Sequence, residues 1–106
     1  MEDRRIFERI TARFPVRFLE AMEAKEGRGS TCDVSANGVS FVTNEDLAKN
    51  AALELWLEIP DSRGPLYTRG RVVWLDNTTV PGENRVGIRL ERAELMGLAR
   101  ALWVKK

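Results

Sequence analysis

The chain has 106 residues, of which 43% are hydrophobic and 31% charged, and its formal net charge is +1. This length suits one soluble domain with a single core, and the near-neutral charge argues against a protein that coats DNA or RNA. Histidine is absent and there is one cysteine, Cys32. These counts exclude histidine-based catalysis, Cys-rich zinc sites and an internal disulfide, so we expect no metal site. An enzyme with this composition would have to rely on carboxylates, lysines or a lone thiol.

The same composition indicates the compartment. A single cysteine suits the reducing cytoplasm. No apolar run approaches the roughly 20 residues of a membrane span. The N-terminus, Met1-Glu2-Asp3-Arg4-Arg5, opens with acidic residues and has no apolar stretch behind it, so it does not resemble a signal peptide. We therefore expect a cytoplasmic protein with no membrane span.

Residues 1–14 precede the first convincing strand and are predicted to form an N-terminal arm. The arm carries an R-x-x-x-R pair, Arg5 and Arg9, with Arg4 just ahead of it. In a helical turn Arg5 and Arg9 would share a face, whereas extended they would lie about 13 Å apart at about 3.3 Å per residue. Guanidinium groups bind phosphate oxygens and guanine edges and stack on bases. The arm therefore suits a nucleotide, and a solvated charged terminus is the alternative.

Alternation of hydrophobic and polar residues with a period of two dominates residues 15–91, which we expect to form a barrel. The expected strands are residues 16–24, 39–41, 53–59, 66–75 and 86–90. The expected turns are residues 25–29, 37–38, 61–65 and 76–82. In the fourth strand, Val72 and Trp74 are predicted to face the core. Short strands at this spacing predict an antiparallel barrel or sandwich.

The end of the chain changes its period. Apolar residues follow the spacing i, i+3, i+4, i+7 at Leu95, Leu98, Ala99 and Leu102. This spacing predicts an amphipathic C-terminal helix over residues 92–104, packed on the sheet.

A second polar motif, D-x-S-x-x-G, lies at Asp33, Ser35 and Gly38. Residues two apart on a strand share a face, so Asp33 and Ser35 would point the same way. A carboxylate can accept from guanine N1–H and N2–H, and a hydroxyl can donate to a phosphate oxygen. Gly38 would permit the turn, in a type I′ hairpin with Asn37, or the close approach of another backbone or ligand. The alternative is a plain hairpin, since these are ordinary turn residues.

Taken together and in this order, the two motifs resemble the paired signature of the PilZ domain family. Arg9 and Asp33 are 24 positions apart, which leaves room for a strand, a loop and the start of a second strand. The likeness covers essentially the whole chain and includes Arg4-Arg5-Ile6-Phe7-Glu8-Arg9-Ile10, Pro15-Val16, Val72-Val73-Trp74 and Arg85-Val86-Gly87-Ile88. Two positions differ from the family's usual residues: Asn50-Ala51 stands where a glycine is frequent, and Leu90 where phenylalanine is frequent.

The resemblance implies an all-β fold, a six-stranded antiparallel β-barrel with a C-terminal helix, and the ligand cyclic di-GMP. Arg5 and Arg9 would clamp phosphate and guanine, while Asp33 and Ser35 would contact guanine and phosphate from the barrel and Gly38 would shape the turn. Arg4 would stack on an additional base of an intercalated ligand dimer.

The expected function is a receptor or adaptor, without enzymatic activity, that changes conformation on binding cyclic di-GMP. It would signal to an effector protein in motility, biofilm or exopolysaccharide control, as a monomer or homodimer. The first alternative is a PilZ-like interaction module that binds no nucleotide. Two further alternatives fit the sequence less well. A small enzyme using Asp33 or Cys32 is disfavoured because the chain has no histidine and no second convergent acid. An RNA-binding barrel is disfavoured because the net charge is near neutral and interleaved aromatic residues are scarce.

Five other side chains have a plain structural interpretation beside any functional one. Trp56 lies on the polar face of its strand, either as a partner-binding anchor or beneath the helix or arm. Trp103, like Trp74, is predicted to belong to the core. Arg69 and Arg71 share a strand face that is expected to be solvated. Cys32 is expected to be a buried or inert thiol.

Overall fold

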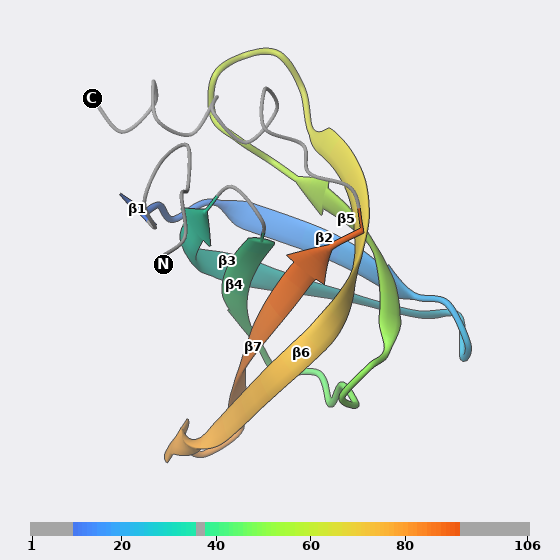
Figure 1. Cartoon of the computed structure of the whole chain (residues 1–106). Helices are drawn as coiled ribbons and strands as arrows, with labels where there is room; N and C mark the ends of the chain where they lie inside the picture. The colour runs from blue at the N-terminus through green and yellow to red at the C-terminus, as the bar shows by residue number, and fades with distance from the viewer. Residues whose placement is uncertain (1–9, 36–37, 92–106) are drawn as a thin grey trace, which may run out of the picture.

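A computed structural model describes residues 10–35 and 38–91, which form seven β-strands (Figure 1). The strands are β1 (Ile10–Thr11), β2 (Pro15–Glu20), β3 (Lys25–Ser35), β4 (Gly38–Thr43), β5 (Ala52–Leu57), β6 (Leu66–Val80) and β7 (Glu83–Leu90). No helix long and apolar enough to cross a membrane occurs among these residues.

Six of the strands close into an antiparallel barrel. The hydrogen-bonded order is β3-β2-β5-β6-β7-β4, and β4 pairs back onto β3 to complete the ring. The short β1 pairs with the end of β3, beyond the part of β3 that pairs with β2. The predicted six-stranded antiparallel barrel is therefore confirmed. The predicted C-terminal helix, residues 92–104, lies outside the described residues.

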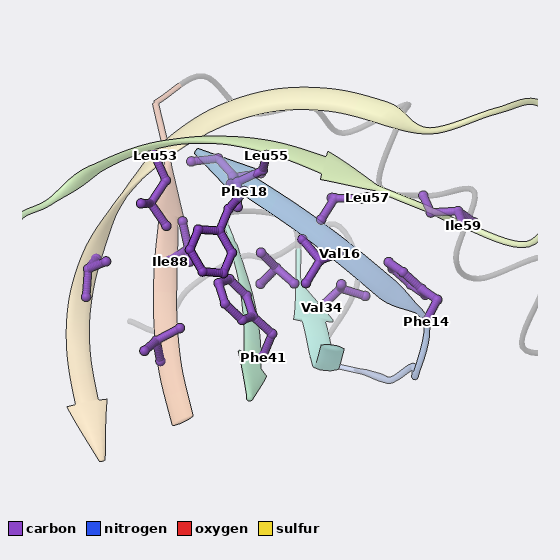
Figure 2. Close-up of a cluster of buried hydrophobic side chains, with 14 residues drawn as sticks. Phe14, Val16, Phe18, Val34, Phe41, Leu53, Leu55, Leu57, Ile59 and Ile88 are labelled. Atoms are coloured by element: carbon purple, nitrogen blue, oxygen red, sulfur yellow. The ribbon is translucent and has the colours of Figure 1, made fainter. Parts of the chain in front are cut away.

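The inward side of the strands supplies a single apolar core (Figure 2). Leu53, Leu55 and Leu57 point inward from β5, as their alternation predicts, and are at most 2% exposed. Phe18 of β2 and Phe41 of β4 meet across the barrel with their ring centroids 5.5 Å apart. Tight packing of these large side chains is the main favourable term in the stability of the barrel.

The first hairpin turns earlier than the sequence indicates, because β2 ends at Glu20 rather than near residue 24. The carboxylate of Glu20 accepts hydrogen bonds from the backbone N–H groups of Met22, at 3.2 Å, and Glu23, at 2.8 Å. Ala24 then adopts a left-handed conformation with a φ of 53°. A side chain that bonds the backbone ahead of it stabilises a turn, so the strand stops there.

The predicted loop at residues 25–29 is wrong, since these residues begin β3. Its glycines are required by packing rather than by a turn. A Cβ atom at Gly27 would overlap the ring of Phe18, and one at Gly29 would overlap the carbonyl oxygen of Val42. A strand glycine of this kind marks the close approach of a neighbour, which a local sequence pattern does not reveal.

The predicted loop at residues 76–82 is also largely strand, since β6 continues to Val80 and turns at Pro81-Gly82. Gly82 takes the left-handed conformation there, with a φ of 80°. The β6–β7 hairpin extends beyond the rest of the barrel (Figure 1). Asn50 also adopts a positive φ, at 74°, a conformation that asparagine tolerates better than most residues other than glycine.

Thr31 attaches the segment before β2 to β3. Its buried hydroxyl accepts from the backbone N–H of Phe14 at 2.9 Å and donates to the carbonyl of Ala12. Beyond this point β1 pairs Ile10 with Val34, so the last residues of the predicted arm form a strand on the barrel.

Candidate ligand-binding site

Four residues form one cross-strand row on the outside of the barrel. Asp33 of β3 lies opposite Ser40 of β4, Ser40 lies opposite Gly87 of β7, and Gly87 lies opposite Trp74 of β6. Residues directly opposite one another on adjacent strands have side chains close enough to interact. The row therefore brings together an acid, a hydroxyl and an indole from three strands, with a glycine on the fourth.

Two β-bulges give this row its direction. Thr31 and Val72 are buried inside the barrel, and simple alternation would turn Asp33 and Trp74 inward as well. The register shifts between Thr31 and Asp33 on β3, and between Val72 and Trp74 on β6. One extra residue reverses the side of every residue that follows, so both side chains face outward. The prediction that Trp74 belongs to the core is therefore wrong, and the residue is 39% exposed.

The row forms part of a pocket of about 160 Å³. Its lining residues are Asp33, Ser35, Gly38, Val39, Ser40, Val73, Trp74, Gly87, Ile88 and Arg89. All three residues of the D-x-S-x-x-G motif are thus brought together. The three arginines expected at the site, Arg4, Arg5 and Arg9, lie outside the described residues.

The carboxylate of Asp33 is held at both of its oxygens. Ser40 Oγ donates to Asp33 Oδ1 at 3.0 Å, and Arg85 Nη2 lies 3.8 Å from Asp33 Oδ2. The side chain of Asp33 is 18% exposed, so it remains accessible from the pocket. The carboxylate can therefore accept further hydrogen bonds from a ligand.

Gly38 is required for close packing between strands and does not lie in the turn. It is the first residue of β4 and pairs with Ser35, so residues 36 and 37 make the connection. A Cβ atom at Gly38 would overlap the carbonyl oxygen of Ile88 on β7. The expected approach of another backbone is therefore confirmed, whereas the expected place of Gly38 in the turn is wrong. Glycine lets β4 and β7 meet at the floor of the pocket.

The sequence identifies only Asp33, Ser35 and Gly38 of the pocket residues, and those that it does not identify include Ser40, Gly87 and Arg89. Each occupies an ordinary alternating position on its strand, so no local signal identifies it. Gly87 has a specific role, because a Cβ atom there would overlap the indole of Trp74. Arg89 is exposed opposite Gly38 and supplies a cation to the pocket wall.

A larger hollow of about 500 Å³ lies elsewhere on the barrel and contains none of the motif residues. Trp56 lines it, with the Arg17 guanidinium 5.1 Å from its ring centroid and the Tyr67 ring 5.4 Å away on the next strand. Trp56 is thus packed by an arginine and a tyrosine on the barrel surface.

Arg69 and Cys32 lie outside the pocket. Arg69 lies 3.6 Å from Glu91 on the solvated face, and Cys32 is a free, half-buried thiol. Within residues 10–35 and 38–91, no three His, Cys, Asp or Glu side chains gather as a metal site would require.

Solved structures with the same fold are similar to this chain at low sequence identity. The inhibitor of motility MotI/DgrA from Bacillus subtilis has a TM-score of 0.73 at 17% identity, covering 97% of this chain and 50% of its own. The chain thus spans about half the length of MotI. The PilZ domain of YcgR from Escherichia coli, solved with c-di-GMP, has a TM-score of 0.67 at 13% identity, covering 96% of this chain and 88% of its own.

The PilZ domain of CeSA from a cellulose-synthesizing bacterium has a TM-score of 0.66 at 16% identity, covering 94% of this chain and 100% of its own. At such low identity, the TM-scores establish a shared fold alone. No curated protein matches the chain significantly in sequence. The model of the PilZ domain family matches residues 3–100. With this match, the closed barrel and the D-x-S-x-x-G residues in one pocket, the chain belongs to the PilZ domain family.

Proposed function

We propose that this protein is a cyclic di-GMP receptor or adaptor that has no chemistry of its own and passes the signal to a protein partner. Membership of the PilZ family supports this proposal, as does the similarity to the YcgR domain solved with c-di-GMP. The similarity to an inhibitor of motility supports motility as one process under control, beside biofilm formation and exopolysaccharide synthesis. The cytoplasm, where this messenger would be met, is the proposed compartment.

One observation carries the proposal: the N-terminal segment joins the barrel beside the pocket. Thr11 pairs directly with Asp33, and Ile10 pairs with Val34. Arg9 is the residue immediately before Ile10. The arginine-bearing arm therefore leads directly into the strand that flanks the acid, which supports the convergence of guanidiniums and carboxylate on one ligand.

Each pocket group has a proposed role. Asp33 accepts from guanine N1–H and N2–H, and Ser35 donates to a phosphate oxygen. Gly38 allows β4 and β7 to approach closely at the base of the pocket. The exposed indole of Trp74 offers a face on which a base can stack. Arg89 adds a fixed positive charge for a phosphate.

The arm supplies the remaining contacts in this proposal. Arg5 and Arg9 clamp phosphate and guanine, and Arg4 stacks on a further base when a ligand dimer binds. The arginine-bearing residues that precede β1 then close over a ligand already bound by the barrel. A ligand-dependent change of this kind alters the surface that a partner protein binds.

Isothermal titration calorimetry with cyclic di-GMP tests the proposal, with GTP and cyclic AMP as controls. We expect binding of cyclic di-GMP at micromolar concentration. Replacing both Arg5 and Arg9 by alanine removes at least two charge-assisted hydrogen bonds, each worth about 1.5–3 kcal/mol, so affinity should fall at least about 100-fold. Arg28→Ala is the matched control, because Arg28 is an exposed arginine on β3 that does not line the pocket.

Two results would contradict the proposal. The first is the absence of any heat with cyclic di-GMP at these concentrations. The second is an Arg5→Ala, Arg9→Ala protein that binds as tightly as the Arg28→Ala protein.

A PilZ-like interaction module that binds no nucleotide is the second candidate. It is favoured by three consecutive apolar residues on β6, since Val73, Trp74 and Leu75 are 38%, 39% and 41% exposed. Exposed apolar runs commonly mark contact surfaces for proteins. Partner binding that is unchanged by cyclic di-GMP would favour this candidate.

A further inference from the structure

The acid at the centre of the pocket is oriented by residues that belong to neither sequence motif. Ser40, on β4, donates its hydroxyl proton to Asp33 Oδ1 at 3.0 Å. Arg85, on β7, lies 3.8 Å from Asp33 Oδ2. Two neighbouring strands, β4 and β7, thus each contribute a contact to the Asp33 carboxylate.

Ser40 is the stronger of these two constraints. It is 4% exposed and directly opposite Asp33 in the sheet, so its hydroxyl has little freedom to turn elsewhere. The Arg85 side chain is 49% exposed, and its distance exceeds that of a hydrogen bond. Exposed ion pairs contribute little, whereas a buried hydrogen bond to a charged group contributes substantially.

The hydrogen bond from Ser40 leaves the carboxylate suited to one kind of base. Each carboxylate oxygen can accept two hydrogen bonds, and Ser40 uses one position on Oδ1. A carboxylate held in one orientation by this hydrogen bond can accept from two adjacent donors, which guanine offers at N1–H and N2–H. Adenine offers one donor beside the lone pair of N1, and that lone pair repels the second carboxylate oxygen.

We propose that Ser40 is a positioning residue that makes Asp33 selective for guanine over adenine. This inference rests on the proposed function, because Asp33 must first contact the base of a cyclic dinucleotide. Sites that hold a polar group rigidly reject ligands that leave the group unpaired. Without the hydroxyl of Ser40, the carboxylate can rotate and accept a single donor from either base.

The test compares the Ser40→Ala variant with the parent, using calorimetric titration with cyclic di-GMP and with cyclic di-AMP. We expect the affinity for cyclic di-GMP to fall about tenfold, as for loss of one hydrogen bond to a charged group. The affinity for cyclic di-AMP should change little, so the ratio of the two affinities should fall by a similar factor. That ratio separates positioning from a general loss of structure.

Thr43→Val is the matched control. Thr43 lies on the same strand and is also 4% exposed, but its hydroxyl donates to the carbonyl of Arg28 at 2.7 Å, outside the pocket. This variant should lower the melting temperature and leave both affinities unchanged. Should Ser40→Ala fail to fold, Ser40→Cys gives the same comparison, since it keeps a similar volume and weakens the donor.

Each outcome decides the question. A parent that binds cyclic di-GMP, with a folded Ser40 variant that keeps the parental ratio, would overturn the role of Ser40 alone. Equal losses of both affinities are one form of that result, because they keep the ratio and indicate general damage to the pocket. A parent that binds no cyclic di-GMP would overturn the proposed function, and this inference with it.

Discussion

Individual carboxylates on the barrel surface are bonded by hydroxyl groups from a neighbouring strand. Ser40 donates to Asp33 at 3.0 Å, and Tyr67 donates to Glu54 at 2.9 Å. The second bond has a measurable consequence. The hydrogen bond to Glu54 is the largest cause that raises the pKa of Tyr67 above its usual 10.0, followed by desolvation and the negative charge of Glu54, while Arg69 acts in the opposite direction. The neutral phenol is therefore favoured in the folded protein.

Removing the acceptor by Glu54→Ala should lower the pKa of Tyr67 towards its usual value. The chain has a single tyrosine, so a spectrophotometric titration of tyrosinate reports this residue alone. Because the folded pKa is raised, the related stability is present below the unfolded pKa of about 10 and is lost as pH rises through the folded value. Identical titration midpoints for the parent and Glu54→Ala would contradict the assignment, and Glu26→Ala on β3 serves as a control.

The elements that create the pocket are two bulged strands and a glycine between them. The bulges on β3 and β6 turn Asp33 and Trp74 outward into the same row, with Ser40 and Gly87 between them. The indole of Trp74 occupies the space that a side chain at Gly87 would need. Bulges are frequent next to functional sites because they redirect single side chains without unfolding a sheet.

Gly87→Ala should therefore displace the indole and cost about 1–3 kcal/mol of unfolding free energy, as overpacking commonly does. The cost should largely disappear when Trp74 is also replaced by alanine, because the overlapping group is then gone. Denaturant unfolding of the parent, the single variants and the double variant measures this coupling. Additive effects of the two changes would contradict the proposed contact.

At the scale of the whole molecule, the ring of strands separates the apolar core from the candidate ligand pocket. The core lies inside the barrel around Phe18 and Phe41 (Figure 2). The pocket lies on the outer face of β3, β4, β7 and β6. The pairing of β4 with β3 closes the ring. Core packing and the pocket thus share the same strands but use their opposite faces.

Phe18→Ala should cost about 3–5 kcal/mol of unfolding free energy, because it leaves a cavity where two rings meet. Met22→Ala, at a side chain that is 87% exposed, should change stability by less than about 0.5 kcal/mol. Denaturant midpoints measure both values. Equal midpoints for the two variants would be inconsistent with a core centred on Phe18.

Local patterns were sufficient for much of this structure. The alternation at Leu53–Leu57 correctly predicted both a strand and its buried side. The spacing of Asp33 and Ser35 correctly predicted one shared face, and both side chains line the same pocket. The failures involve contacts between distant residues. The glycine at position 27 predicts a loop, but it lies in a strand where the ring of Phe18, on another strand, leaves no room for a Cβ atom. A local pattern cannot reveal that contact.

By itself, the sequence determined an antiparallel barrel or sandwich and most of its inward-facing residues through alternation, and its two motifs indicated the family, whose resemblance implied six strands. The tertiary structure alone decided that Trp74 faces outward, that Ser40 donates to Asp33 and that Thr11 pairs with Asp33. Bulge positions and strand registers decide these features. They are set by the fit between strands far apart in the chain, and that fit exists only once the ring has closed.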